Sequence, residues 1–417
     1  MSDRNRAAAV DESLDAWFAI DAIVSSTRSR RALVLRGRMR RDGEPVVLKC
    51  RAMAPYAANA RVVVRNELVR YEANVCAHAL RTLRNDEFFA THVGTTRRRW
   101  CFDTLRDAEK NPPAGGVADR ALLAWMRLLP YDSVDDLNAG AEIVVTRDAG
   151  EETAWRHLVR RTSATEEDVA AFVAQMSCAL DVMEDAELVH GDLRWSNVGY
   201  PPIPEDGKRL FDLREERFVR EHENNEFCVE MSRAIKIFDW DNAHYGRMPA
   251  HAKKGAHMPH HCSDGTNMNR VYDKLGFLRL LRYHFPSLSF VSDADVASLE
   301  PAFSEYAYVD PRDGEISRQI SRRGSSGDPL WPDIQRLERA ANEVTRRVYV
   351  VASLILVAER KRRVREKFLL AVEGDNVEEI ERYAAYPLAR DLDVESMRFA
   401  TRVVRERVER EVFTTRH

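Results

Sequence analysis

Cysteine is scarce in this chain, and no two cysteines have the spacing of a redox or metal-binding motif. Six cysteines stand at positions 50, 76, 101, 178, 228 and 262, and none forms a CxxC pair. Scattered cysteines of this kind are typical of proteins in a reducing compartment, where disulfides are rare. We therefore expect free thiols and an intracellular, cytoplasmic protein, with the nucleus left open.

Long apolar runs and an excess of one charge are also missing. The longest apolar run, residues 348–358, is interrupted only by Ser353 and is far shorter than the roughly 20 residues that span a bilayer. We interpret this run as a buried helix. The polar residues 1–15 do not resemble a secretory signal. The formal net charge is -3, whereas a dedicated nucleic-acid binder usually has a basic excess. We predict neither a membrane nor a nucleic-acid partner.

The apolar pattern changes from strands to helices along the chain. Short β-like runs predict an antiparallel sheet, with one helix over 61–83 after the third run; the runs lie at 20–25, 32–38, 46–49, 97–102, 125–129 and 143–146. Thr165 to Asp168 is a capping signature that opens a long helix, and further helices are predicted over 271–284 and 334–370. We predict an α+β chain with a β-rich unit over 1–148. A helical unit over 149–417 would contain an insertion at 201–233 and a helical C-terminal extension.

One segment has the residue types that phosphoryl transfer needs. His190-Gly191-Asp192-Leu193-Arg194-Trp195-Ser196-Asn197 matches the pattern H-R-D-L-x-x-x-N, except that glycine replaces arginine. It resembles the catalytic loop of protein kinases, especially haspin and the fungal kinase-like families. Its His-Gly-Asp opening also resembles the aminoglycoside and choline phosphotransferases. The resemblance implies that Asp192 is the catalytic carboxylate, that Arg194 contacts the transferred phosphate, and that Asn197 binds Mg²⁺.

A second segment, Ala234 to Ala243, is a β-like run that ends in carboxylates and resembles the magnesium-binding D-F-G segment. Asp239 would hold the metal, since Mg²⁺ prefers hard oxygen ligands. Asp212 is a rival because it lies nearer to the usual distance after the catalytic asparagine. We favour Asp239 because its upstream strand and downstream Asn-Ala fit the family better. Asp241 is either a second ligand or an exposed acidic residue.

Lysine is rare, which gives weight to one lysine near the start of the chain. Lysine supplies nine of the 64 basic residues, and Lys49 is the only lysine among the first 109 residues. The run Val46 to Lys49 resembles the V-A-I-K strand whose lysine holds the α- and β-phosphates of ATP. The resemblance implies a glutamate partner on the next helix, Glu67 or alternatively Glu72. Asp273 would brace the catalytic loop from a later helix.

Two features depart from the kinase pattern. The segment Ser25 to Arg31 has no glycine where kinases have a glycine-rich phosphate loop, and Gly191 replaces the arginine that senses a phosphorylated activation loop. The five histidines between residues 244 and 261, together with Cys262, are interpreted as part of a solvated loop, with a zinc site as the alternative.

The resemblance predicts a bilobal protein-kinase-like fold and a phosphotransferase that depends on ATP and Mg²⁺. A protein serine or threonine is the leading acceptor. A small-molecule hydroxyl of aminoglycoside, choline-like or sugar type is the alternative, and a catalytically silent binding module is the third possibility.

Overall fold

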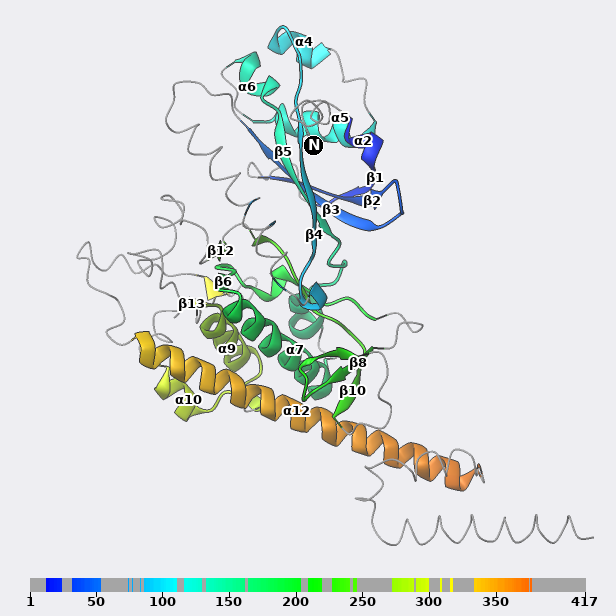
Figure 1. The fold of residues 1–417 in the computed structure, drawn as a ribbon, viewed down its shortest axis with the longest axis vertical. Coiled ribbons are helices and arrows are strands. Elements are labelled where there is room, and N and C mark those ends of the chain that lie inside the picture. The colour runs from blue at the N-terminus through cyan, green and yellow to red at the C-terminus, as the bar shows by residue number, and fades with distance from the viewer. Residues whose placement is uncertain are drawn as a thin grey trace, which may run out of the picture.

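The computed structural model has mixed α+β architecture, with an antiparallel sheet and a separate group of helices (Figure 1). The described residues are 13–24, 32–53, 74, 77, 83, 86–110, 116–129, 133–161, 164–203, 209–219, 227–240, 243–245, 272–288, 290–299, 308–309, 316–317, 334–374 and 376. Several predicted features lie outside these residues: Glu67, Glu72, Asp241, residues 25–31, most of the helix over 61–83 and most of the histidine-rich segment.

Five antiparallel strands form the main sheet in the order β1-β2-β3-β5-β4. The strands are β1 (Phe18–Ile23), β2 (Leu33–Met39), β3 (Pro45–Ala52), β4 (His92–Arg98) and β5 (Ala141–Arg147). Burial alternates along β3, so that Val46, Leu48 and Cys50 face a buried core while Lys49 faces the opposite side. This alternation follows from the two-residue period of a strand, and it sets the side of the sheet on which Lys49 can act.

Short helices cover the core side of the sheet: α2 (Leu14–Trp17), α5 (Val117–Met126) and α6 (Val134–Asn138). Helix α4 (Leu105–Lys110) lies between β4 and α5 in the chain. The Asp15 carboxylate accepts hydrogen bonds of 3.0 Å from the amides of Ala118 and Asp119, the first residues of α5 after Val117. The Asp119 carboxylate in turn accepts a hydrogen bond of 3.2 Å from the Leu14 amide. These reciprocal bonds fix α2 against the start of α5, where a carboxylate also complements the helix dipole.

The predicted strands at 125–129 and 97–102 need correction. Residues 117–126 form helix α5, because Leu122, Trp125 and Met126 recur at helical spacing and are all buried. The strand predicted at 97–102 is β4, which begins at His92 and ends at Arg98.

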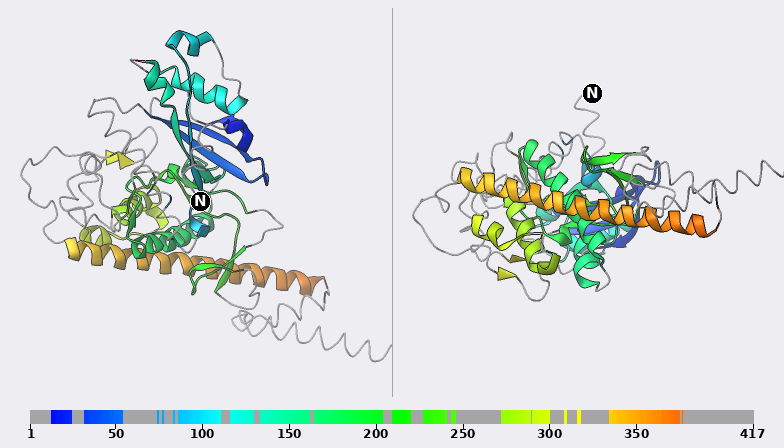
Figure 2. Two further views of the ribbon diagram at one scale, coloured as in Figure 1. Left: turned by 45° about the horizontal axis from the view of Figure 1, so that its top comes forward. Right: turned by 90° about the horizontal axis from the view of Figure 1, so that it is seen from below.

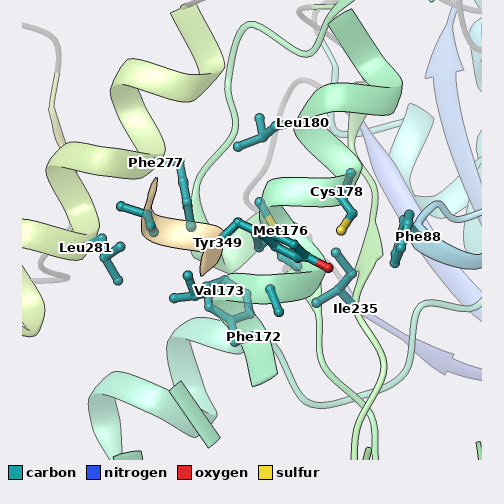
Figure 3. Packing of buried hydrophobic residues seen from close by; sticks show 14 of the residues in the cluster. Phe88, Phe172, Val173, Met176, Cys178, Leu180, Ile235, Phe277, Leu281 and Tyr349 are labelled. Atoms are coloured by element: carbon teal, nitrogen blue, oxygen red, sulfur yellow. The ribbon is translucent and has the colours of Figure 1, made fainter. Parts of the chain in front are cut away.

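The helical part contains α7 (Glu166–Asp185), α9 (Tyr272–His284), α10 (Asp293–Ser298) and α12 (Ile334–Glu373), together with the π-helix η2 (Trp155–Arg160). The predicted cap at Thr165 is confirmed, because its hydroxyl accepts from the Asp168 amide and the Asp168 carboxylate accepts from the Thr165 amide. Helix α12 packs along α7 and extends past it (Figure 2). Figure 3 shows Phe172, Met176 and Tyr349 within the apolar core of this part.

The run over 348–358 lies on α12, and only one side of it is buried. Val348 is fully buried, whereas the Leu354 side chain is 64% exposed. The prediction of a buried helix is therefore confirmed for one side of this run and wrong for the other. No helix within the described parts of the chain is both long and apolar enough to cross a membrane.

The segment predicted as an insertion contains a three-stranded sheet of β8 (Arg209–Asp212), β9 (Arg217–Val219) and β10 (Cys228–Met231), in the order β10-β8-β9. This sheet packs into the helical core. The Phe211 ring lies 6.3 Å from Phe88 of the 3₁₀ turn η1 (Asp86–Phe88), and the Tyr349 hydroxyl donates a 2.5 Å hydrogen bond to the Leu213 carbonyl.

Two-residue strands complete the fold. Strand β6 (Leu188–Val189) pairs with β12 (His244–Tyr245), β7 (Val198–Gly199) pairs with β11 (Lys236–Ile237), and β13 (Tyr308–Val309) pairs with β14 (Ile316–Ser317). Two further 3₁₀ turns are η3 (Trp195–Asn197) and η6 (Pro286–Leu288). The pairs β6-β12 and β7-β11 bring the two segments with predicted chemistry side by side.

Candidate active site

The loop between β6 and β7 is held by a buried carboxylate from α9. Asp273 is only 3% exposed, and its two oxygens accept from the His190 amide at 2.6 Å and from the Gly191 amide at 3.1 Å. Gly191 has a φ of +74°, a backbone conformation that side chains with a Cβ rarely adopt. Glycine at this position therefore lets the loop turn so that both amides point at one carboxylate.

The ring of His190 connects this loop to the segment after β11. The Asp192 amide donates to its Nδ1 atom at 3.3 Å, and its Nε2 atom lies 2.8 Å from the Phe238 carbonyl oxygen. Because an amide can only donate and a carbonyl can only accept, the proton of the neutral ring belongs on Nε2. The centroid of the His190 ring lies 4.7 Å from that of the Trp240 ring. The Trp240 centroid lies 5.8 Å from that of the Phe89 ring.

Three predicted site residues lie together in the loop. The Asp192 Oδ1 atom accepts from Arg194 Nε at 2.9 Å, and Asn197 Nδ2 donates to the Asp192 backbone carbonyl at 2.9 Å. The amide group of Asn197 is thereby oriented, and its oxygen stays an acceptor for a cation. Turn η3 makes this possible, because it brings Asn197 back toward the start of the loop.

Lys49 and Asp239 form an ion pair that joins the main sheet to the loop region. The Lys49 ammonium contacts Asp239 Oδ1, with the two side chains 23% and 35% exposed. Asp239 follows β11 and has a φ of +68°. Non-glycine residues in this conformation are uncommon and cluster at functional sites. The preceding residue is fixed, since the Phe238 amide donates to the Asn197 carbonyl at 3.0 Å.

The rival aspartate, Asp212, has a different structural role. Its Oδ1 atom accepts from the amides of Arg214 at 2.8 Å and Glu215 at 3.2 Å, and its Oδ2 atom lies 3.6 Å from the Cys228 sulfur. It is buried at the turn between β8 and β9. These contacts stabilise that turn, whereas Asp239 faces the ammonium of Lys49.

A buried glutamine positions the strand that leads to Asp239. Gln175 lies on α7; its side-chain oxygen accepts from the Ile235 amide at 3.0 Å, and its nitrogen donates to the Arg233 carbonyl at 3.1 Å. Sequence analysis missed this residue. Its signal was a polar side chain within the apolar stretch Val169 to Leu180 of a predicted helix, where a buried amide needs partners.

Charged side chains gather where the segment after β5 meets β7. Glu152 accepts from Arg233 Nη1 at 2.6 Å and pairs with Arg161 at 2.9 Å, and its backbone carbonyl accepts from the Tyr200 amide at 2.7 Å. Burial raises the pKa of the Glu152 carboxyl, but the hydrogen bond and charge of Arg233 outweigh this and lower the pKa overall. Burial, together with Arg233, lowers the pKa of His157, so its ring is neutral near neutral pH.

The arrangement offers a small set of oxygen donors for a metal. Within the described residues, no three His, Cys, Asp or Glu side chains cluster as a metal site. Mg²⁺ is usually held by one or two carboxylates together with substrate phosphates, so the Asp239 carboxylate and the Asn197 amide oxygen form a chemically suitable set. The predicted glutamate partner of Lys49, Glu67, lies outside the described residues.

No protein-family model matches the chain, and no curated protein matches it either.

Proposed function

We propose that this chain is a phosphotransferase that depends on ATP and Mg²⁺. The observation that carries the proposal is the pairing of Lys49 on β3 with Asp239 after β11, beside a loop that holds Asp192 and Asn197. Protein kinases have a lysine on their third strand, a metal-binding aspartate after a later strand, and an aspartate and asparagine in one loop. A scaffold without chemistry has no physical need for all of these groups together.

Each residue has a role that follows from its position. Bound Mg·ATP supplies the γ-phosphoryl group and a divalent charge that offsets the charge on the phosphates. Asp239 and Asn197 would hold the metal by oxygen atoms, and the Lys49 ammonium would offset negative charge on the phosphates. Asp192 accepts the proton of the attacking hydroxyl. Arg194, 2.9 Å from Asp192, holds that carboxylate in place and brings a positive charge to the transferred phosphoryl group.

The proposed fold is bilobal and kinase-like, with a first unit over 1–148 and a second over 149–417. Two buried apolar clusters support a division into two units, with one departure from the boundary: η1, within 1–148, packs in the second cluster. One joins the main sheet to α2 and α5, and the other joins η1 to α7, α9 and α12. The ion pair joins Lys49 of the first unit to Asp239 of the second. We propose that ATP binds between the two units at this pair.

The proposed acceptor is a serine or threonine hydroxyl of a protein. Two sequence features support it: Arg194 occupies the position of the lysine in such kinases, and Asp273 follows Asp239 by 34 positions, enough for a protein-docking segment. A small-molecule hydroxyl is the second candidate, favoured by Gly191, whose left-handed backbone suits the His-Gly-Asp opening of those phosphotransferases. In both cases we propose a cytoplasmic protein without a membrane or nucleic-acid partner, consistent with four described free cysteines.

The test is turnover of Mg·ATP by the purified chain, alone, with a generic protein substrate, and with aminoglycosides, choline and sugars. Asp192→Ala should lower the rate by about 100-fold or more, the usual contribution of a positioned proton acceptor. Asp185→Ala is the matched control, because Asp185 is exposed at the end of α7 and should leave the rate unchanged. Absence of turnover and of any nucleotide-induced thermal shift would favour the silent binding module.

A further inference from the structure

A buried lysine follows directly after the carboxylate that holds the catalytic loop. Lys274 is only 2% exposed, although lysine is almost never fully buried unless it is paired. It stands in the first turn of α9, next to Asp273. Adjacent helical residues point about 100° apart, so the two side chains leave this turn in different directions.

The Lys274 ammonium is enclosed by groups from two other helices. It donates to Asp181 Oδ1 of α7 at 2.7 Å and to Asn342 Oδ1 of α12 at 2.7 Å, and it also contacts Glu184 Oε2 of α7. Asn342 Nδ2 closes the group by donating to Glu184 Oε1 at 3.0 Å. We call these four residues, Asp181, Glu184, Lys274 and Asn342, the lysine cage.

We propose that Lys274 and Asn342 are positioning residues through which α12 sets the geometry of the catalytic loop. Asp273 can accept hydrogen bonds from the amides of His190 and Gly191 only while the first turn of α9 keeps its position and its rotation about the helix axis. The lysine cage fixes that turn from a second direction, because a buried charge with three oxygen partners resists movement. The assignment of the loop as catalytic rests on the proposed function, whereas its mechanical connection to α12 does not.

The lysine proposed to bind phosphate lies in a different part of the fold from the cage. Lys49 is carried by β3, whose buried residues belong to the cluster around the main sheet, whereas the cage lies among α7, α9 and α12 in the other cluster. Loosening of the cage should therefore misplace Asp192 while nucleotide affinity is retained. That pattern separates a positioning role from a general loss of stability, which would affect both.

The first experiment measures hydrogen exchange of single amides in the full chain without nucleotide. Asn342→Ala removes the α12 member of the cage and leaves the Lys274 ammonium with its two carboxylates. We expect the His190 and Gly191 amides to exchange about tenfold faster, the change that loss of one charge-assisted hydrogen bond can produce. Amides in the middle of α7 serve as the reference for unfolding of the helical part and should be unchanged. Glu343→Ala, the exposed neighbour on α12, is the matched control.

Unchanged exchange at His190 and Gly191 in Asn342→Ala would overturn the proposal, as would equal acceleration in the middle of α7. The second readout is kinetic: kcat should fall about tenfold with the KM for ATP retained, as expected when only a loop carrying the proton acceptor moves. A rise in KM with kcat unchanged would also contradict it. If the wild-type chain shows no turnover while the exchange effect is present, the proposed function fails and the connection between α12 and the loop stands.

Discussion

The sheet β8-β9-β10 is expected to be an integral part of the helical core, and Phe211→Ala tests this. Phe211 lies on the central strand β8 and is fully buried. Its ring centroid lies 6.3 Å from that of Phe88 and 5.1 Å from that of Phe218. The substitution therefore leaves a cavity between η1 and the small sheet. A Phe→Ala change in a packed core costs about 3–5 kcal/mol, through lost transfer free energy and the unfilled cavity.

The neighbouring residue on the same strand is the matched control. Leu210 is only partly buried and points to the other face of β8, so Leu210→Ala should cost about 1 kcal/mol. Urea unfolding followed by tryptophan fluorescence gives both values from the shift in midpoint at constant slope. If the midpoint of Phe211→Ala matched that of Leu210→Ala, the segment would be a separable insertion and our description of the core would be wrong.

Three further outcomes follow from the site and its surroundings. Gly191→Ala should lower the free energy of unfolding by about 1–2 kcal/mol because of the positive φ, and Gly191→Asn should lower it by less. Equal stability of the alanine variant and wild type would refute the backbone argument. Asp212→Asn should retain Mg·ATP turnover while Asp239→Asn loses it, and the reverse result would move the metal to Asp212. The pKa of Glu152 is lowered in the folded state, so its contribution to stability is present above the unfolded pKa near 4.5 and is lost as pH falls through the folded pKa. Urea midpoints should therefore fall less for Glu152→Gln than for wild type between about pH 5 and pH 3, whereas parallel curves would contradict the assignment.

Local patterns account for the elements that sequence analysis predicted well. Strand β3 has strict alternation of buried and partly exposed residues, and the capping box at Thr165 begins α7 where its pattern indicated. Helices α9 and α12 also begin within one residue of their predicted starts. In each case the signal lies within a few neighbouring residues, so no knowledge of distant contacts was needed.

The errors arose where burial depends on the rest of the fold. The short apolar run at 125–129 could not be distinguished from a strand by its length. Residues Trp125 and Met126 are helical because their burial in the core requires the helical spacing of α5. Strand β4 has few apolar residues, and its Arg97 pairs with Glu142 of the neighbouring β5. Apolar residues also occur on the exposed side of α12, as at Leu354, so composition alone overstated its burial.

In the candidate site, too, local features could be predicted from the sequence and long-range contacts could not. The spacing of Asp192 and Asn197 is local, and the motif could be recognised along the chain. The contact of Lys49 with Asp239 spans 190 positions and was not predicted, because the resemblance gave Lys49 a glutamate partner and gave Asp239 a metal-binding role. The lysine cage joins α7, α9 and α12, and the only sequence signal for it was the rarity of lysine.

The measurement that tests the central claim most directly is the Mg²⁺-dependent affinity for ATP, determined by calorimetry on the full chain and on four variants. We expect Lys49→Met and Asp239→Asn to weaken binding by about tenfold or more, because each removes one charged contact to phosphate or metal. Asp192→Asn should bind ATP as wild type does while losing turnover, and Lys367→Met, an exposed lysine on α12, should behave as wild type in both respects. Binding by wild type that ignores Mg²⁺ and survives both Lys49→Met and Asp239→Asn would contradict the proposed site.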